Sequence, residues 1–157
     1  MLLFEQGEDL WALPLATGGT PSLLLKSAGG ASCSRDGKWM SYTSAESGRP
    51  EVYLTTFPKP GRKWQVSPKG AFAGGWWTEN EILYVDMEAA IWSVDVVPDA
   101  ALDLTIGKPK KYIDAPNRID NGAVHPDGER CLLAVRQGET HSRPVTLVLN
   151  WPAIRRP

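Results

Sequence analysis

The sequence predicts an all-β protein of about 14 short strands, and three observations support this prediction. First, apolar residues occur in short runs rich in Val, Ile, Tyr and Trp, without a long helical period. Second, the 15 glycines and 13 prolines supply turns between such runs. Third, the runs recur with a period of about 40–45 residues, which is typical of a repeat architecture.

The repeat is marked by three short segments that occupy the same place in successive units. They are Ser34–Lys38, Trp77–Glu81 and His125–Glu129, and they are followed by strands that align at Met40–Tyr42, Ile82–Tyr84 and Cys131–Leu133. A second set aligns further on, at Asp9–Trp11, Glu51–Tyr53 and Ala90–Trp92. Four short strands in a unit of this length predict the blades of a β-propeller.

Each marker segment contains an expected tight turn. Gly37 and Gly128 can take positive φ without steric cost, and we expect Asn80 to do the same in the middle unit. Asp36 and Asp127 are interpreted as turn formers whose carboxylates accept hydrogen bonds from nearby backbone amides.

The repeats divide the chain, 1–157, into a single segment of four units. We expect a partial blade at 1–27, blades at 28–67 and 70–113, and a partial blade at 121–151. The strands expected in the two middle units are Gly30–Ser34, Lys38–Ser44, Pro50–Phe57, Lys63–Ser67, Phe72–Trp77, Glu81–Asp86, Ala89–Val97 and about Pro109–Ile113. Those expected in the outer units are Met1–Glu5, Asp9–Leu15, Ser22–Lys26, Gly122–His125, Arg130–Gln137 and Val145–Asn150. Leu2 and Phe4 align with Met40 and Tyr42, so we expect the chain to begin inside a blade.

These motifs carry a resemblance. Ser34–Ser44, with Gly48–Tyr53, Phe57–Pro58 and Lys63–Ser67, resembles the repeat of TolB-like (WD-repeat-like) β-propellers, especially those fused C-terminally to bacterial serine/threonine kinases. Pro144–Trp151 is similar to the ending of those propellers. The resemblance implies a ring of six or more blades, of which this chain would supply about three and a half as the sensor or scaffold part of a larger protein. Such proteins are often periplasmic or extracytoplasmic. The chain has no kinase signature.

Composition excludes several classes. With 17 basic and 18 acidic residues the net charge is −1, which does not favour nucleic-acid binding. No apolar run approaches the roughly 20 residues of a membrane span. The segment at 1–11 lacks the features of a signal peptide, so we expect either a cytoplasmic protein or a lost export signal. Cys33 and Cys131 form neither a disulfide framework nor a zinc motif, and we expect no metal and no cofactor.

A partial ring would leave apolar faces and strand edges uncovered at both ends. Two copies related by a two-fold axis could cover both ends at once. We therefore expect a homodimer that closes a ring. The alternative is strand exchange, in which the partner completes the three-stranded units.

The candidate recognition residues are Trp76, Trp77 and His125. Gly74 and Gly75 permit close backbone approach, and strand alternation sends the two indoles to opposite faces. We expect one indole to pack between blades and the other to point toward the mouth of a channel. For His125, a strand-end side chain is the simpler interpretation.

Other groups give weaker signals. Asp86 and Glu88 could hold a hard cation, although a solvated turn is favoured because further ligands are lacking. His141–Ser142 lacks a third catalytic group. Lys108–Lys111 and Arg155–Arg156 are interpreted as solvated edges.

The sequence therefore predicts a non-catalytic propeller module for protein or ligand recognition. Two alternatives stay open. One is a hydrolase or lyase with a central metal, and the other is a truncated fragment without independent function.

Overall fold

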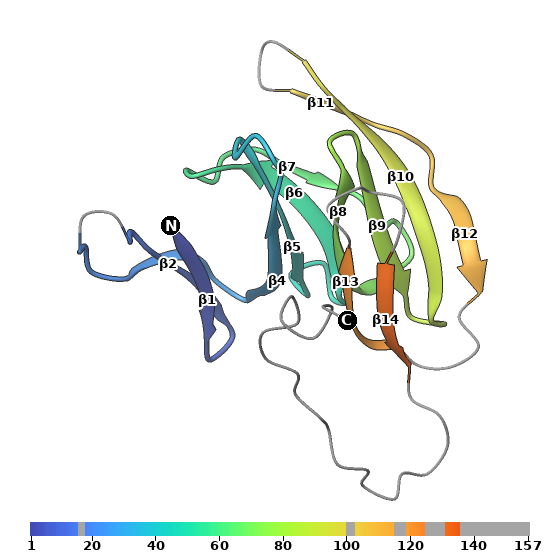
Figure 1. Cartoon of the computed structure of the whole chain (residues 1–157), viewed down its shortest axis with the longest axis horizontal. Coiled ribbons are helices and arrows are strands. Elements are labelled where there is room, and N and C mark those ends of the chain that lie inside the picture. The colour runs from blue at the N-terminus through green and yellow to red at the C-terminus, as the bar shows by residue number, and fades with distance from the viewer. Residues whose placement is uncertain (16–17, 100–102, 115–118, 125–130, 136–157) are drawn as a thin grey trace, which may run out of the picture.

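The computed structural model describes residues 1–15, 18–99, 103–114, 119–124 and 131–135 of the chain (Figure 1). Within these ranges every regular element is a β-strand and every strand pairing is antiparallel, so the all-β prediction is confirmed. The same ranges contain no helix of the length and apolarity that a membrane span requires.

The described strands form four sheets (Figure 1). The first sheet contains β1 (Leu2–Gln6), β2 (Asp9–Leu13) and β3 (Ser22–Leu25). The second contains β4 (Ala28–Cys33), β5 (Trp39–Ser44), β6 (Glu51–Thr56) and β7 (Lys63–Gln65). The third contains β8 (Ala71–Thr78), β9 (Glu81–Asp86), β10 (Ala90–Pro98), β11 (Leu104–Ile106) and β12 (Lys110–Asp114). The fourth contains β13 (Ile119–Val124) and β14 (Cys131–Val135).

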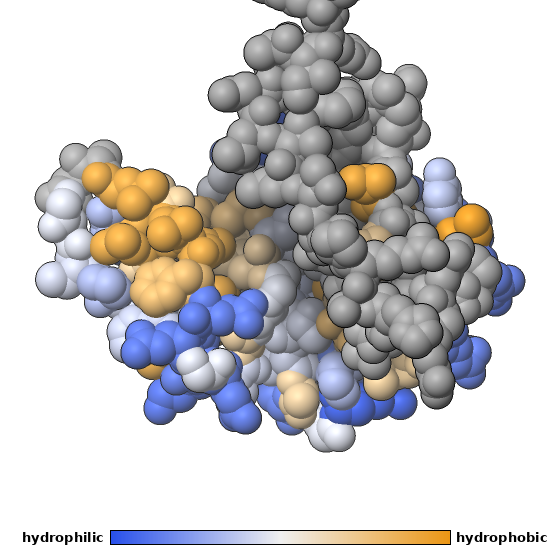
Figure 2. Space-filling view, turned by 60° about the horizontal axis from the view of Figure 1, so that its bottom comes forward, coloured by the Kyte–Doolittle hydropathy of each residue, from blue (hydrophilic) through white to orange (hydrophobic). Residues whose placement is uncertain are grey.

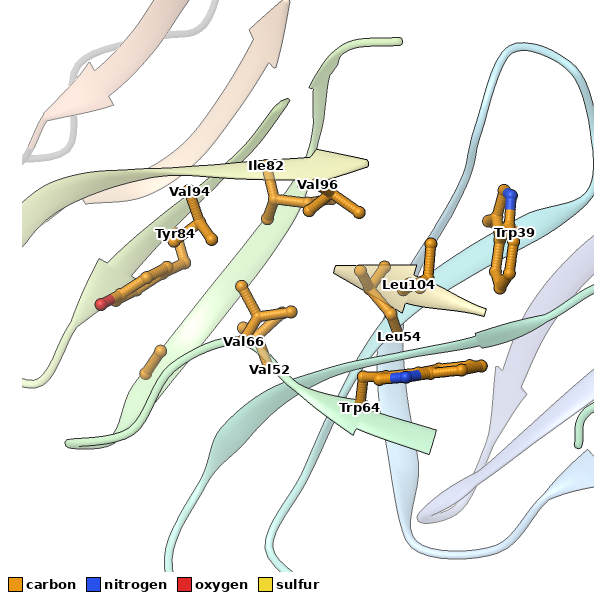
Figure 3. Close-up of a cluster of buried hydrophobic side chains, with 11 residues drawn as sticks. Trp39, Val52, Leu54, Trp64, Val66, Ile82, Tyr84, Val94, Val96 and Leu104 are labelled. Carbon is orange, nitrogen blue, oxygen red and sulfur yellow. The ribbon is translucent and has the colours of Figure 1, made fainter. Parts of the chain in front are cut away.

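The first three sheets pack face to face in chain order. A core cluster between the first and second sheets contains Leu10, Ala28, Met40, Tyr42 and Tyr53. A larger cluster lies between the second and third sheets and contains Trp39, Val52, Leu54, Trp64, Val66, Ala71, Ile82, Tyr84, Val94, Val96 and Leu104 (Figure 3). The second sheet therefore uses both of its faces, one toward each neighbour. We call the face toward the preceding sheet the backward face and the face toward the following sheet the forward face.

The eight strands expected in the two middle units agree with β4 to β10 and β12 to within two residues at each end. The main difference is β11, which forms between the expected strands Ala89–Val97 and Pro109–Ile113, where the sequence predicts no strand. Leu104 is the first residue of β11 and is buried against the second sheet. Burial of this apolar side chain stabilises the short strand. The expected strand Val145–Asn150 lies outside the described residues.

The turn between β8 and β9 corrects one expectation. Asn80 does not take positive φ, because among the described non-glycine residues only Ser27 and Ala89 do so. Glu79 and Asn80 form a two-residue connection, and the register of β8 shifts between Trp76 and Thr78. Such a bulge increases the local twist, which a positive-φ turn would otherwise supply.

Candidate interaction surface

A cross-strand aromatic pair recurs at an equivalent place in each of the first three sheets. The pairs are Phe4–Trp11 in the first sheet, Tyr42–Tyr53 in the second and Tyr84–Trp92 in the third. In the second and third sheets the earlier residue comes from the strand that follows the marker turn, β5 or β9, and in the first sheet it comes from β1, which the repeat alignment places at the same position. The later residue comes from the next strand in each sheet. The three pairs therefore share one position and one facing in the repeat.

Two of the pairs are covered by the preceding sheet. Tyr42 and Tyr53 are both 5% exposed and pack in the cluster shared with the first sheet. Tyr84 is buried and Trp92 is half-buried against the cluster shared with the second sheet. Burial, with a smaller effect of the nearby Glu46 carboxylate, raises the pKa of Tyr42 to about 12. The preceding sheet therefore buries these pairs wholly or in part.

The third pair lies on the backward face of the first sheet. This outer apolar face is composed of Leu2, Phe4, Trp11, Leu13 and Leu23, which the strand register places on one side. Leu2 is 47% exposed and Leu23 is 41% exposed. Figure 2 shows apolar side chains gathered over the first sheet, at the left of the view. A contiguous apolar area of this kind on a sheet is typical of an interaction surface.

The opposite face of the first sheet, its forward face, packs against the second sheet. Leu10 is buried there, and Leu3 and Leu25 pack beside it against the second sheet. Because both faces of the first sheet are apolar, the sheet has the composition of one that is buried on two sides.

The glycine–tryptophan segment of β8 belongs to the packing between sheets. A Cβ on Gly74 would lie 2.8 Å from Val52 Cγ2 and 2.9 Å from Tyr84 Cβ, so a glycine is required for this close approach. Trp76 packs against the cluster between the second and third sheets, as expected for one of the two indoles. Trp77 is half-buried, and its orientation toward a channel stays a prediction.

The turn residues of the second sheet take the geometry expected of them. Gly37 has φ of +68°, and Asp36 Oδ1 accepts hydrogen bonds from Ser34 Oγ at 2.7 Å and from Lys38 N at 3.1 Å. The bond from Ser34, followed by the one from Lys38, lowers the pKa of Asp36. The remaining sequence candidates His125, Asp127 and Gly128 lie outside the described residues.

One buried acid was not among the sequence candidates. Glu51 is 1% exposed, and its carboxylate accepts hydrogen bonds from Arg49 Nε (2.7 Å), Ser67 Oγ (2.6 Å) and Gly70 N (3.0 Å). Burial alone would raise the pKa of Glu51, but these hydrogen bonds together lower it. The network fixes the connection from β7 to β8. The sequence signal that could have revealed this buried network is the charged residue Glu51 at the start of an apolar strand.

The carboxylates of Asp86 and Asp103 also accept hydrogen bonds from backbone amides and indole groups. Asp86 accepts hydrogen bonds from Glu88 N, Ala90 N and Trp92 Nε1, which leaves its oxygens engaged in the β9–β10 turn. Asp103 accepts hydrogen bonds from Trp64 Nε1 and Leu104 N and so ties β11 to the second sheet. The favoured interpretation of Asp86 as a turn residue agrees with these contacts.

The remaining polar candidates are at edges. Lys110 of β12 forms an ion pair with Asp95 at 2.8 Å, and Lys111 forms one with Asp114. Cys33 carries a free thiol whose pKa is raised by burial. The described part of the chain contains no group of three or more His, Cys, Asp or Glu residues placed to share a metal ion. His141, Ser142, Arg155 and Arg156 lie outside the described ranges.

No protein-family model matches the chain, and no curated protein is detectably similar to it.

Proposed function

We propose that the chain is a non-catalytic module of the β-propeller type that acts by binding a protein surface, and that the outer apolar face of the first sheet is where it binds. The observation that carries the proposal is the Phe4–Trp11 pair. This pair occupies the same strand positions as the two pairs that a preceding sheet covers, but it lies on a face that carries exposed leucines.

The chemistry of this face favours a protein partner over a small molecule. Aromatic side chains on a strand surface offer a large contact area with little conformational freedom to lose, and they are enriched at the centres of protein interfaces. The face is also a sheet surface, with an unbroken pairing register between β1 and β2 and a register shift between Leu10 and Trp11 in the pairing of β2 with β3. Regular sheets stack on other sheets at about 10 Å.

The acids of the described residues support a structural use of the polar groups. Glu51, Asp86 and Asp103 each accept at least two hydrogen bonds from backbone, hydroxyl, indole or guanidinium groups of the fold. Groups committed in this way hold turns and sheet contacts. Metal analysis with a broad hydrolase screen tests the non-catalytic part: stoichiometric metal together with turnover would overturn it.

The binding part is tested by sedimentation velocity of the whole chain across the micromolar range. We expect concentration-dependent association that Trp11→Lys weakens at least tenfold. Val97→Lys is the matched control, because Val97 is an exposed apolar residue on β10, away from this face. A chain that stays monomeric throughout, or equal effects of the two substitutions, would contradict the proposal.

A further inference from the structure

We infer that the outer apolar face of the first sheet is covered by the forward face of the fourth sheet of a second copy, and that the same contact is made twice around a two-fold axis. This inference rests on the proposed function and names its partner. It follows from the rule by which the sheets of this chain cover one another.

The rule is visible at the two covered pairs. The Tyr42–Tyr53 pair is covered by forward-face residues of the first sheet, among them Leu3 and Leu10. The next pair, in the third sheet, is covered by the forward face of the second sheet, which includes Val52, Leu54 and Val66. A backward aromatic pair is therefore matched, in both cases, with a forward face of an antiparallel sheet that includes aliphatic residues, and the forward face of the second sheet also carries Trp39 and Trp64.

The fourth sheet carries residues of the forward type. In the repeat alignment Leu132 takes the position of Leu3 in the first sheet and Ser41 in the second, both one residue before the aromatic position. Strand alternation puts Ala134 on the same face as Leu132. Leu132 is 76% exposed and Ala134 is exposed as well. The described chain thus offers a backward face with exposed leucines and a half-buried aromatic pair, and exposed residues at two forward positions of β14.

Symmetry limits the assembly to two copies. If the first sheet of one copy meets the fourth sheet of its partner about a two-fold axis, the reverse contact forms at the same time. Both exposed faces are then covered and no third copy can add.

The test uses two single substitutions at exposed leucines, Leu23→Asp and Leu132→Lys, in the whole chain. Each interface contains one Leu23 and one Leu132, so each variant alone has both interfaces damaged. We expect at least tenfold weaker dimerisation for either variant. In an equal mixture, one interface pairs Asp with Lys and the other is unchanged, so we expect the dimer mass to return. Circular dichroism checks folding, and Val97→Lys is the control for added surface charge.

The outcomes separate the inference from the proposed function. If Leu23→Asp weakens dimerisation while Leu132→Lys does not, the face binds a different surface and the inference is overturned, although the proposed function stands. The inference is also overturned if the mixture stays monomeric or if both variants dimerise like the unaltered chain. If the unaltered chain is itself monomeric, the proposed function fails as well.

Discussion

Tyr42 and Tyr53 stack across β5 and β6 with their ring centroids 5.7 Å apart and their planes inclined by 27°. The third sheet repeats this relationship with Tyr84 and Trp92, whose planes are inclined by 9°. In both sheets the preceding sheet covers the pair. The outer face of the first sheet carries the same pair without a described sheet in front of it, and the account of function depends on that difference.

Gly74→Ala tests the close approach of β8 to the second sheet. The added methyl would lie under 3 Å from Val52 Cγ2 and Tyr84 Cβ, so the two sheets must separate locally. We expect a loss of about 1–3 kcal/mol in the free energy of unfolding, measured by urea denaturation. Gly75→Ala is the control, because its nearest contact would be 3.3 Å, at Ser32 Cβ. Equal losses for both variants would contradict this description of the contact.

Glu51→Ala tests the buried carboxylate network. The substitution leaves Ser67 Oγ and Gly70 N without the acceptor they use in the buried β7–β8 connection. A buried donor without a partner costs about 1–3 kcal/mol, so we expect a loss of about 3 kcal/mol for the pair. Urea denaturation measures it. A loss below about 1 kcal/mol would show that the network contributes little.

The same carboxylate predicts how stability depends on pH. The folded-state pKa of Glu51 is lowered from its ordinary value of 4.5, so its contribution is present above that value and is lost as the pH falls through the folded pKa. Asp36 and Asp86 are shifted in the same direction. We expect the free energy of unfolding to fall on acidification below about 4.5. The Glu51→Gln variant should show a shallower fall, and an unchanged slope would contradict the assignment.

Leu104→Ala tests whether β11 holds the third sheet to the second. Leu104 is buried in the cluster between them, beside Leu54 in Figure 3. Truncating a buried leucine leaves a cavity, and we expect a loss of about 2–3 kcal/mol. Val97→Ala, at a residue that is 56% exposed, should change stability little. If both truncations cost the same, β11 does not act as a structural link.

Gly37→Ala tests the marker turn. Nothing lies within 4 Å of the added Cβ, so the cost comes only from the positive φ and should be about 1 kcal/mol. Gly37→Asn should cost less, because Asn tolerates this backbone region better. A loss for Asn as large as that for Ala, in thermal or urea unfolding, would point to another cause.

The sequence was sufficient for the strands whose ends are set by local turn chemistry. Strands β5 and β9 follow marker turns, and the other strands from β4 to β10 lie in short apolar runs between turn residues, so their positions could be predicted from the sequence. The short strand β11 could not be predicted, because it depends on a non-local contact of Leu104 with the second sheet. The φ angle of Asn80 could not be predicted either. It depends on a bulge in β8, which increases the local twist that a positive-φ turn would otherwise supply.

The candidate surface was only partly predictable. The repeat alignment gave the positions of Phe4 and Trp11, but their role depends on which sheet face is covered. That information comes from the packing of whole sheets. Trp76, a candidate recognition residue from the Gly74–Trp77 segment, packs between two sheets, as expected for one of the two indoles, but which of the two would do so depends on the packing of the sheets.

Hydroxyl-radical footprinting of the whole chain tests the central claim most directly, namely that the outer apolar face is buried by a protein contact in solution. The labelling of Phe4 and Trp11 is measured by mass spectrometry at dilute and at micromolar concentrations, with exposed Tyr112 as the internal reference. We predict that Phe4 and Trp11 become protected as concentration rises while the labelling of Tyr112 stays constant. Labelling of Phe4 and Trp11 that does not change with concentration, in a monomeric sample, would contradict the account.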